Sequence, residues 1–116
     1  MSPRTSGPGL AMRILFDNGS PRPLRHRLFG HQVETARERG WHTLANGALL
    51  SQTEEAGFEV LLTTDQGIRY QQNISNRQIA VVVLMNTDWS RIAPRTEAIR
   101  TALEGIRPGE LREVPI

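Results

Sequence analysis

The chain has 116 residues, of which 38% are hydrophobic and 22% charged, a length and composition typical of one domain with a continuous apolar core. It has no cysteine, which excludes disulfide frameworks and thiolate zinc sites. The net charge is only +2, but all 14 basic residues are arginines, whose planar guanidinium suits phosphate, so the composition permits nucleic-acid binding without requiring it.

The first segment, residues 1–11, contains Pro, Gly and Ser but no periodic apolar pattern. We expect it to form a disordered leader ahead of one domain that spans residues 12–116. The chain shows neither a signal-peptide pattern nor an apolar run of the roughly 20 residues that a membrane-spanning helix needs. We therefore expect a cytoplasmic location and no membrane association.

The first apolar run, RILF, is followed by the turn sequence DNGS, which predicts a buried strand that ends just before Asp17. The next segment, SPRPLRHRLFG, predicts a helix with Ser20 as its N-cap, Pro21 in the first turn and Gly30 as its stop. The segment HQVETARER fits either a short strand over residues 32–35 or a continuing helix, and we favour the strand.

A second helix is predicted within TLANGALLSQTEEAGF, with Asn46 as its cap and Gly57 as its stop. The runs EVLLTT and QIAVVVLM predict two further strands, and the second of these is the most apolar stretch of the chain. A last helix begins at Thr87 or Asp88, with Pro94 in or before its first turn, and ELREVPI is compatible with a final edge strand.

This alternation of strands and helices predicts an α/β domain with a mainly parallel sheet, because right-handed crossovers place helices on both faces of such a sheet. Ligands of open parallel sheets bind beyond the carboxyl ends of the strands, where the strand order reverses. Only three aspartates are present, and two of them, Asp17 and Asp65, directly follow predicted strands. These two carboxylates therefore mark the predicted crevice.

Two carboxylates on neighbouring strands could share a hard cation such as Mg²⁺, which binds one or two carboxylates and several waters. Their mutual repulsion without metal predicts a raised pKa for at least one of them. The alternative is structural: Asp17 and Asp65 would each cap the turn that follows, DNGS and DQGI.

Residues 12–84 contain three segments in a fixed order: an aspartate after the first strand in MRILFDNGS, then ARERGWHTLANGALL, then LLTTDQGIRYQQN. In this combination they resemble the PIN-like proteins of bacteria, in a branch described as toxin-like. The resemblance implies a three-layer α/β/α fold around a mainly parallel five-stranded sheet of order 3-2-1-4-5. In that order the strands before Asp17 and Asp65 would be neighbours.

The same resemblance implies an endoribonuclease that depends on Mg²⁺ or Mn²⁺ and cleaves RNA with three or four acidic residues. Asp17 corresponds to the first acid and Asp65 to the acid after the fourth strand. Besides RNA, the resemblance implies an antitoxin protein and a second copy of the chain, in a homodimer, as partners.

The remaining acids of the family pattern do not align one to one with this chain. Asn46 lies near the second position and would be a neutral metal ligand, while Gly67 stands where many relatives have an aspartate. Glu38 and Asp88 are the substitute ligands, although a surface charge for Glu38 and a helix cap for Asp88 are open as ordinary roles. A PIN-like module that binds RNA or a protein without cleaving is the alternative to the nuclease.

Basic and aromatic residues follow both aspartates closely. Arg22 and Arg25 come after the first one, and Arg69 and Tyr70 come after the second. Arginines of this kind would bind the phosphates of single-stranded RNA, and the tyrosine would stack on a base. The alternative for the arginines is ordinary solvated surface charge. The three histidines show no metal-ligand spacing.

Overall fold

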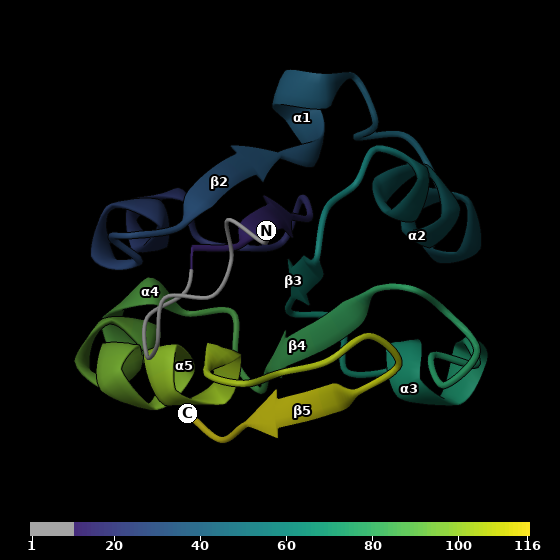
Figure 1. Cartoon of the computed structure of the whole chain (residues 1–116). Helices are drawn as coiled ribbons and strands as arrows, with labels where there is room; N and C mark the ends of the chain where they lie inside the picture. The colour runs from purple at the N-terminus through teal and green to yellow at the C-terminus, as the bar shows by residue number, and fades with distance from the viewer. Residues whose placement is uncertain (1–10) are drawn as a thin grey trace.

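The computed structural model describes residues 11–116, so the expected leader over residues 1–11 lies outside the described part except for its last residue. Five strands form one sheet in which every neighbouring pair is parallel, in the order β2-β1-β3-β4-β5 (Figure 1). The strands are β1 (Arg13–Phe16), β2 (Gln32–Thr35), β3 (Val60–Thr63), β4 (Ala80–Leu84) and β5 (Leu111–Val114).

The helical elements lie in the connections between strands. They are η1 (Arg22–Arg27), α1 (Ala36–Arg39), α2 (Asn46–Glu55), α3 (Ile68–Gln71), α4 (Trp89–Ile92), η2 (Ala93–Arg95) and α5 (Thr96–Leu103), where η denotes a 3₁₀ helix. No helix within residues 11–116 is long and apolar enough to cross a membrane.

Helices cover both faces of the sheet, because strand side chains alternate between two separate cores. Ile14 and Phe16 of β1 point into one core, which η1, α4 and α5 cover. Leu15 points into the other core, which α1, α2 and α3 cover. Figure 1 shows α4 and α5 on one side of the sheet and α2 and α3 on the other. The expected three-layer α/β/α architecture with a parallel five-stranded sheet is confirmed.

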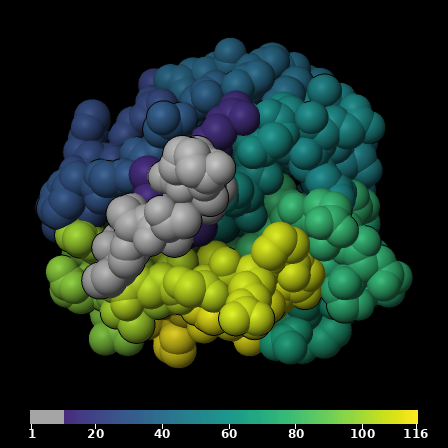
Figure 2. All heavy atoms as spheres, in the orientation of Figure 1, coloured from purple at the N-terminus to yellow at the C-terminus, as the bar shows by residue number. Residues whose placement is uncertain are grey.

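The central strands are fully buried, which explains their uniformly apolar sequences. β3 lies between β1 and β4, in the registers Ile14↔Val60 and Val60↔Ala80. The three most apolar runs of the chain therefore form three neighbouring parallel strands. In the space-filling view the region of β2 and α1, in blue, and the C-terminal part of the chain, in yellow-green, occupy opposite sides, as this strand order requires (Figure 2).

The strand order implied by the family resemblance, 3-2-1-4-5, is wrong for this chain. The observed order is 2-1-3-4-5, and Asp65 follows the third strand rather than the fourth. The physical reason is that residues 40–45, between α1 and α2, form turns and coil without a strand, so only β2 lies outside β1. The strands that precede the two aspartates are neighbours nevertheless.

Several helix starts differ from the sequence prediction because polar side chains are used elsewhere. Ser20 does not cap η1; its hydroxyl donates toward Asp17 and toward the carbonyl of Leu62. Asn46 does not cap α2; it is the first residue of that helix, and its amide donates to Asp65.

The strand over residues 32–35 is confirmed, and it leads into α1 through a capping box of Thr35 and Glu38. The final helix begins after Asp88, which caps α4 as one of the two predicted alternatives. A 3₁₀ turn containing Pro94 divides this helix into α4 and α5, since proline has no N–H to continue an α-helical ladder. The final edge strand is also confirmed, as β5.

Candidate functional site

The two aspartates lie at the same edge of the sheet, one residue after β1 and two residues after β3. The pairing continues past β1, since the N–H of Asp17 donates to the carbonyl of Leu62 at 3.1 Å. Strand order reverses between β1 and β3: the chain proceeds to β2 on one side and to β3, β4 and β5 on the other. Asp17 and Asp65 therefore lie at the position where open parallel sheets bind ligands.

The carboxylate of Asp17 is held by three donors. Its Oδ1 accepts from the N–H of Gly19 at 3.2 Å and from the hydroxyl of Ser20 at 2.9 Å. Its Oδ2 accepts from the hydroxyl of Thr63, the last residue of β3. These bonds fix the orientation of the side chain.

The carboxylate of Asp65 is held by one backbone and one side-chain donor. Its Oδ1 accepts from the N–H of Gly67 at 2.9 Å, and its Oδ2 accepts from the amide of Asn46 at 2.6 Å. A Cβ on Gly67 would lie 3.3 Å from Oδ1 of Asp65 and 3.2 Å from Nε2 of Gln71. The turn is therefore packed closely around the carboxylate, and glycine fits it without displacing either side chain.

Thr63 connects the two aspartates and is the site residue that the sequence analysis missed. Its hydroxyl donates to Asp17 and accepts from the N–H of Asp65 at 3.0 Å. Its side chain is fully buried. The available signal was a threonine at the end of a buried strand, two residues before an acid, but such residues are common where strands meet turns.

Burial raises the pKa of the Asp17 carboxyl above its ordinary value. Hydrogen bonds from Thr63, Ser20 and Gly19 oppose this shift, and the charge of Asp65 adds a smaller increase. The expectation of a raised pKa is confirmed for Asp17, with desolvation rather than repulsion as its largest cause.

Neither aspartate has a basic partner in the part of the chain that the structure describes. The ion pairs there all use glutamates: Glu34, Glu38, Glu54, Glu110 and Glu113. The negative charge at the carboxyl edge of β1 and β3 is therefore not compensated by any described arginine or histidine. A cation from solution would compensate it.

The donor set is small for a metal centre, because residues 11–116 bring no three acidic or histidine side chains together around one point. Two carboxylates with water completing the shell are nevertheless a kind of donor set that Mg²⁺ and Mn²⁺ accept, since each carboxylate oxygen has two lone pairs. Oδ2 of Asp17 and both oxygens of Asp65 each accept one described hydrogen bond, which leaves lone pairs free. Asn46 supports Asp65 by donating to it, rather than by presenting a ligand oxygen.

The two substitute ligands are not part of this centre. Glu38 completes the capping box of α1 and pairs with Arg25 through both oxygens, at 2.9 and 3.0 Å. These contacts lower the pKa of Glu38 to about 2. Asp88 accepts from the N–H of Ser90 at 3.0 Å and from its hydroxyl at 2.9 Å. Both acids have the ordinary structural roles that their sequence contexts left open.

The four residues expected to bind RNA differ in how free they are. Arg25 is paired with Glu38, and Arg69 with Glu113 at 2.8 Å. Arg22 is exposed, and its side chain makes no ion pair or hydrogen bond with another described residue. Tyr70 is 84% exposed and lies next to Arg69 on α3.

Comparison with known proteins identifies no relative of this chain. The carboxylate pair therefore has to be interpreted from its own geometry and from the residues that surround it. No family model, no curated protein and no solved structure matches the chain.

Proposed function

We propose that the protein is a metal-dependent endoribonuclease of the PIN-like type, with Mg²⁺ or Mn²⁺ held between Asp17 and Asp65. The observation that carries this proposal is the position of the two carboxylates at the switch point of the sheet, with no described basic partner. The likeness of residues 12–84 to PIN-like proteins supplies the reaction class. The proposal also includes a cytoplasmic location, an antitoxin protein as partner and a homodimer.

The bound ion would polarise a water for attack on phosphorus and offset charge on the phosphoryl oxygens. The protein's contribution is to hold two carboxylates in place for it. Thr63 orients Asp17, and Asn46 orients Asp65, through hydrogen bonds that exist without any ligand. Burial of Asp17 would also favour cation binding, because a desolvated carboxylate attracts a cation more strongly than a solvated one does.

Phosphate binding would begin at Arg22, which has no described partner. Arg25 and Arg69 would bind phosphate only by leaving their glutamates. Exchange of this kind is energetically accessible, because exposed ion pairs contribute little to stability.

The experiment is Mn²⁺-stimulated cleavage of single-stranded RNA by the wild type, Asp17→Asn and Asp65→Asn, alongside direct measurement of Mn²⁺ binding. Both substitutions should abolish cleavage and Mn²⁺ binding while RNA binding persists, since removing negative charge does not weaken phosphate attraction. Asp88→Asn is the matched control, because asparagine caps helices as well as aspartate does. Equal cleavage by the wild type and Asp17→Asn would show that the activity is not this protein's.

A second candidate function is an RNA- or protein-binding module without cleavage. The observation that favours it is that the pair has no third acid: the position near the second family acid is Asn46, which donates to Asp65. RNA binding without cleavage at every Mn²⁺ concentration would establish this candidate in place of the nuclease.

A further inference from the structure

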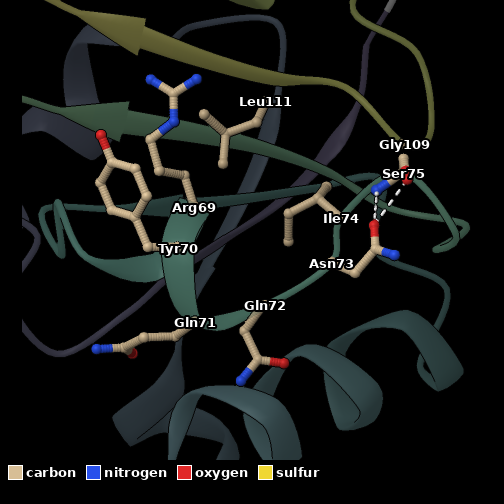
Figure 3. Close-up of a pocket in the computed structure, with 9 residues that line it drawn as sticks. All are labelled: Arg69, Tyr70, Gln71, Gln72, Asn73, Ile74, Ser75, Gly109 and Leu111. Carbon is tan, nitrogen blue, oxygen red and sulfur yellow. Dashed lines mark hydrogen bonds between the residues drawn. The ribbon is translucent and has the colours of Figure 1, made fainter.

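An open groove of about 480 Å³ runs over α3 (Figure 3). Its walls come from α3, from the loop after it, and from the start of β5. This volume lies within the range of about 300–1,000 Å³ that small-molecule sites occupy. We call it the α3 groove.

An exposed aromatic ring stands at one side of the α3 groove. Tyr70 is the most exposed large hydrophobic side chain within residues 11–116, at 84%, and the guanidinium of Arg69 lies 5.7 Å from its ring centre. Figure 3 shows the two side chains next to each other on α3, with Ile74 and Leu111 beyond Arg69. A free aromatic face beside a cation and an apolar floor suits a flat, electron-rich ring.

The rest of the wall is polar and fixed. Oδ1 of Asn73 accepts from both the N–H and the hydroxyl of Ser75, at 3.2 and 2.7 Å, so its amide nitrogen is left as a donor. Gly109 closes the far side, where a Cβ would lie 3.1 Å from the carbonyl oxygen of Ser75. Such amide groups can hydrogen-bond the edges of an unstacked nucleic-acid base.

The α3 groove is connected to the carboxylate pair by two hydrogen bonds. Gln71, which lines the groove, accepts from the amide of Asn46 at 3.2 Å, and the same amide donates to Asp65 at 2.6 Å. Two side chains, Gln71 and Asn46, therefore separate a ligand in the groove from Asp65.

A carboxylate competes with any phosphate at this position. Glu113 of β5 pairs with Arg69 at 2.8 Å, and both side chains are partly exposed. A phosphate that approaches Tyr70 would take over the guanidinium from Glu113, which would then return to solvent.

We propose that the α3 groove binds one base of single-stranded RNA by stacking on Tyr70, and that Glu113 limits this binding by competing with the backbone phosphate for Arg69. The proposal rests on the proposed function for its ligand class, RNA. It assigns the groove a role that does not depend on whether the RNA is then cleaved.

The test is fluorescence anisotropy with short, labelled single-stranded RNA at low salt without metal. Tyr70→Ala should weaken binding about 5- to 150-fold, the effect expected for losing one stacked base, while Tyr70→Phe should bind as the wild type does. Phe29→Ala is the matched control, because Phe29 is also exposed, at 66%, but lies after η1 and outside the groove.

The competition by Glu113 has its own readout. Glu113→Gln should strengthen RNA binding, and combining it with Arg69→Ala should remove the gain, because the gain acts through Arg69. Glu97→Gln makes the same change of charge on the exposed surface of α5 and should leave affinity nearly unchanged. An equal gain from Glu97→Gln would reduce the effect to net charge and overturn the competition.

The two proposals fail separately. The groove proposal is overturned if Tyr70→Ala binds RNA with wild-type affinity, or if the wild type does not bind RNA at all. Asp17-dependent cleavage of RNA in the same sample would still support the nuclease proposal. Binding that depends on Tyr70, without cleavage at any Mn²⁺ concentration, supports the groove and rejects the nuclease.

Discussion

Thr63 donates its hydroxyl proton to Oδ2 of Asp17 across the β1–β3 boundary, and the hydroxyl oxygen of Thr63 accepts from the N–H of Asp65. Thr63→Val keeps the shape of the side chain but leaves a carboxylate oxygen and a backbone N–H without this partner. We expect a loss of about 1–3 kcal/mol in the free energy of unfolding, measured by urea denaturation, and recovery of most of it in Thr63→Ser.

The control for that substitution is Thr53→Val. Thr53 is equally buried, but its hydroxyl donates only to the carbonyl of Leu49 within its own helix, at 2.6 Å. This change should therefore cost clearly less than Thr63→Val. Equal losses at the two positions would mean that the Thr63 bridge has no special weight.

The buried charge of Asp17 should make this residue destabilising in the absence of metal. Because its folded pKa is raised, the folded state binds the proton more tightly than the unfolded state. Asp17→Asn should therefore match or exceed the wild type in free energy of unfolding at pH 7. A loss of more than about 2 kcal/mol, beyond that of one lost cap, would instead make turn capping the main role of Asp17.

The pH dependence gives the same prediction a second measurement. As the pH falls through the folded pKa of Asp17 toward 3.8, the carboxylate of the wild type takes up a proton and loses its buried charge. The difference in free energy of unfolding between Asp17→Asn and the wild type should therefore shrink. Mn²⁺ at about 100 times its dissociation constant should stabilise the wild type by about 2.7 kcal/mol and leave Asp17→Asn unchanged. Thermal or urea unfolding with and without Mn²⁺ measures both effects.

His31 should make the fold sensitive to mild acid. Its Nδ1 accepts from the N–H of Met12 at 3.1 Å, and burial, with a smaller contribution from the charge of Arg100, lowers its pKa below 6.5. The folded state favours the neutral imidazole of His31. The free energy of unfolding should therefore fall as the pH drops from about 6.5, the unfolded pKa, through the lower pKa of the folded state. His31→Gln should remove this part of the slope, and an unchanged slope would contradict the assignment.

A side chain at position 109 should destabilise the fold, since φ of Gly109 is +87° and a Cβ would lie 3.1 Å from the backbone oxygen of Ser75. Gly109→Ala should lower the free energy of unfolding by about 1 kcal/mol or more and narrow the α3 groove. Gly105→Ala is the control, because its φ is +66° but nothing lies within 4 Å of the added methyl. The difference between the two losses measures the contact with Ser75.

The fold was largely predictable because two-sided burial leaves a strong signal in a sequence. The runs that became β1, β3 and β4 are apolar except for Arg13 and Thr63, since helices cover both faces of their sheet. The strand order was predicted incorrectly because it came from the family resemblance, and the apolar pattern of the chain carries no information on which side of β1 each crossover returns.

The site was predictable only in part, and the reason is the sequence separation of its contacts. Asp17 and Asp65 were identified because an acid directly after an apolar strand is unusual. The partners of the acids and arginines lie far along the chain: Asn46 bonds to Asp65, Glu113 pairs with Arg69, and Thr63 bonds to Asp17. Pattern reasoning assigned Asn46 to a helix cap, since the nearest backbone groups are the only partners that a sequence reveals.

Asn46→Asp tests whether a third acid restores a stronger metal site. The change replaces the donor that lies 2.6 Å from Oδ2 of Asp65 with a carboxylate, so it removes one hydrogen bond and adds repulsion with Asp65. Without metal, this variant should be less stable than the wild type at pH 7 and should recover as the pH falls and carboxylates take up protons. With Mn²⁺ the order of stability should reverse, because a carboxylate is a better ligand for this ion than an amide. Titration calorimetry should show at least tenfold tighter Mn²⁺ binding by the variant, roughly 1.4 kcal/mol.

Asn76→Asp makes the same change of charge at an exposed position of the loop before β4 and should alter neither the stability nor the Mn²⁺ affinity. Equal Mn²⁺ affinity in Asn46→Asp and the wild type would mean that the Asp17–Asp65 edge does not hold the ion.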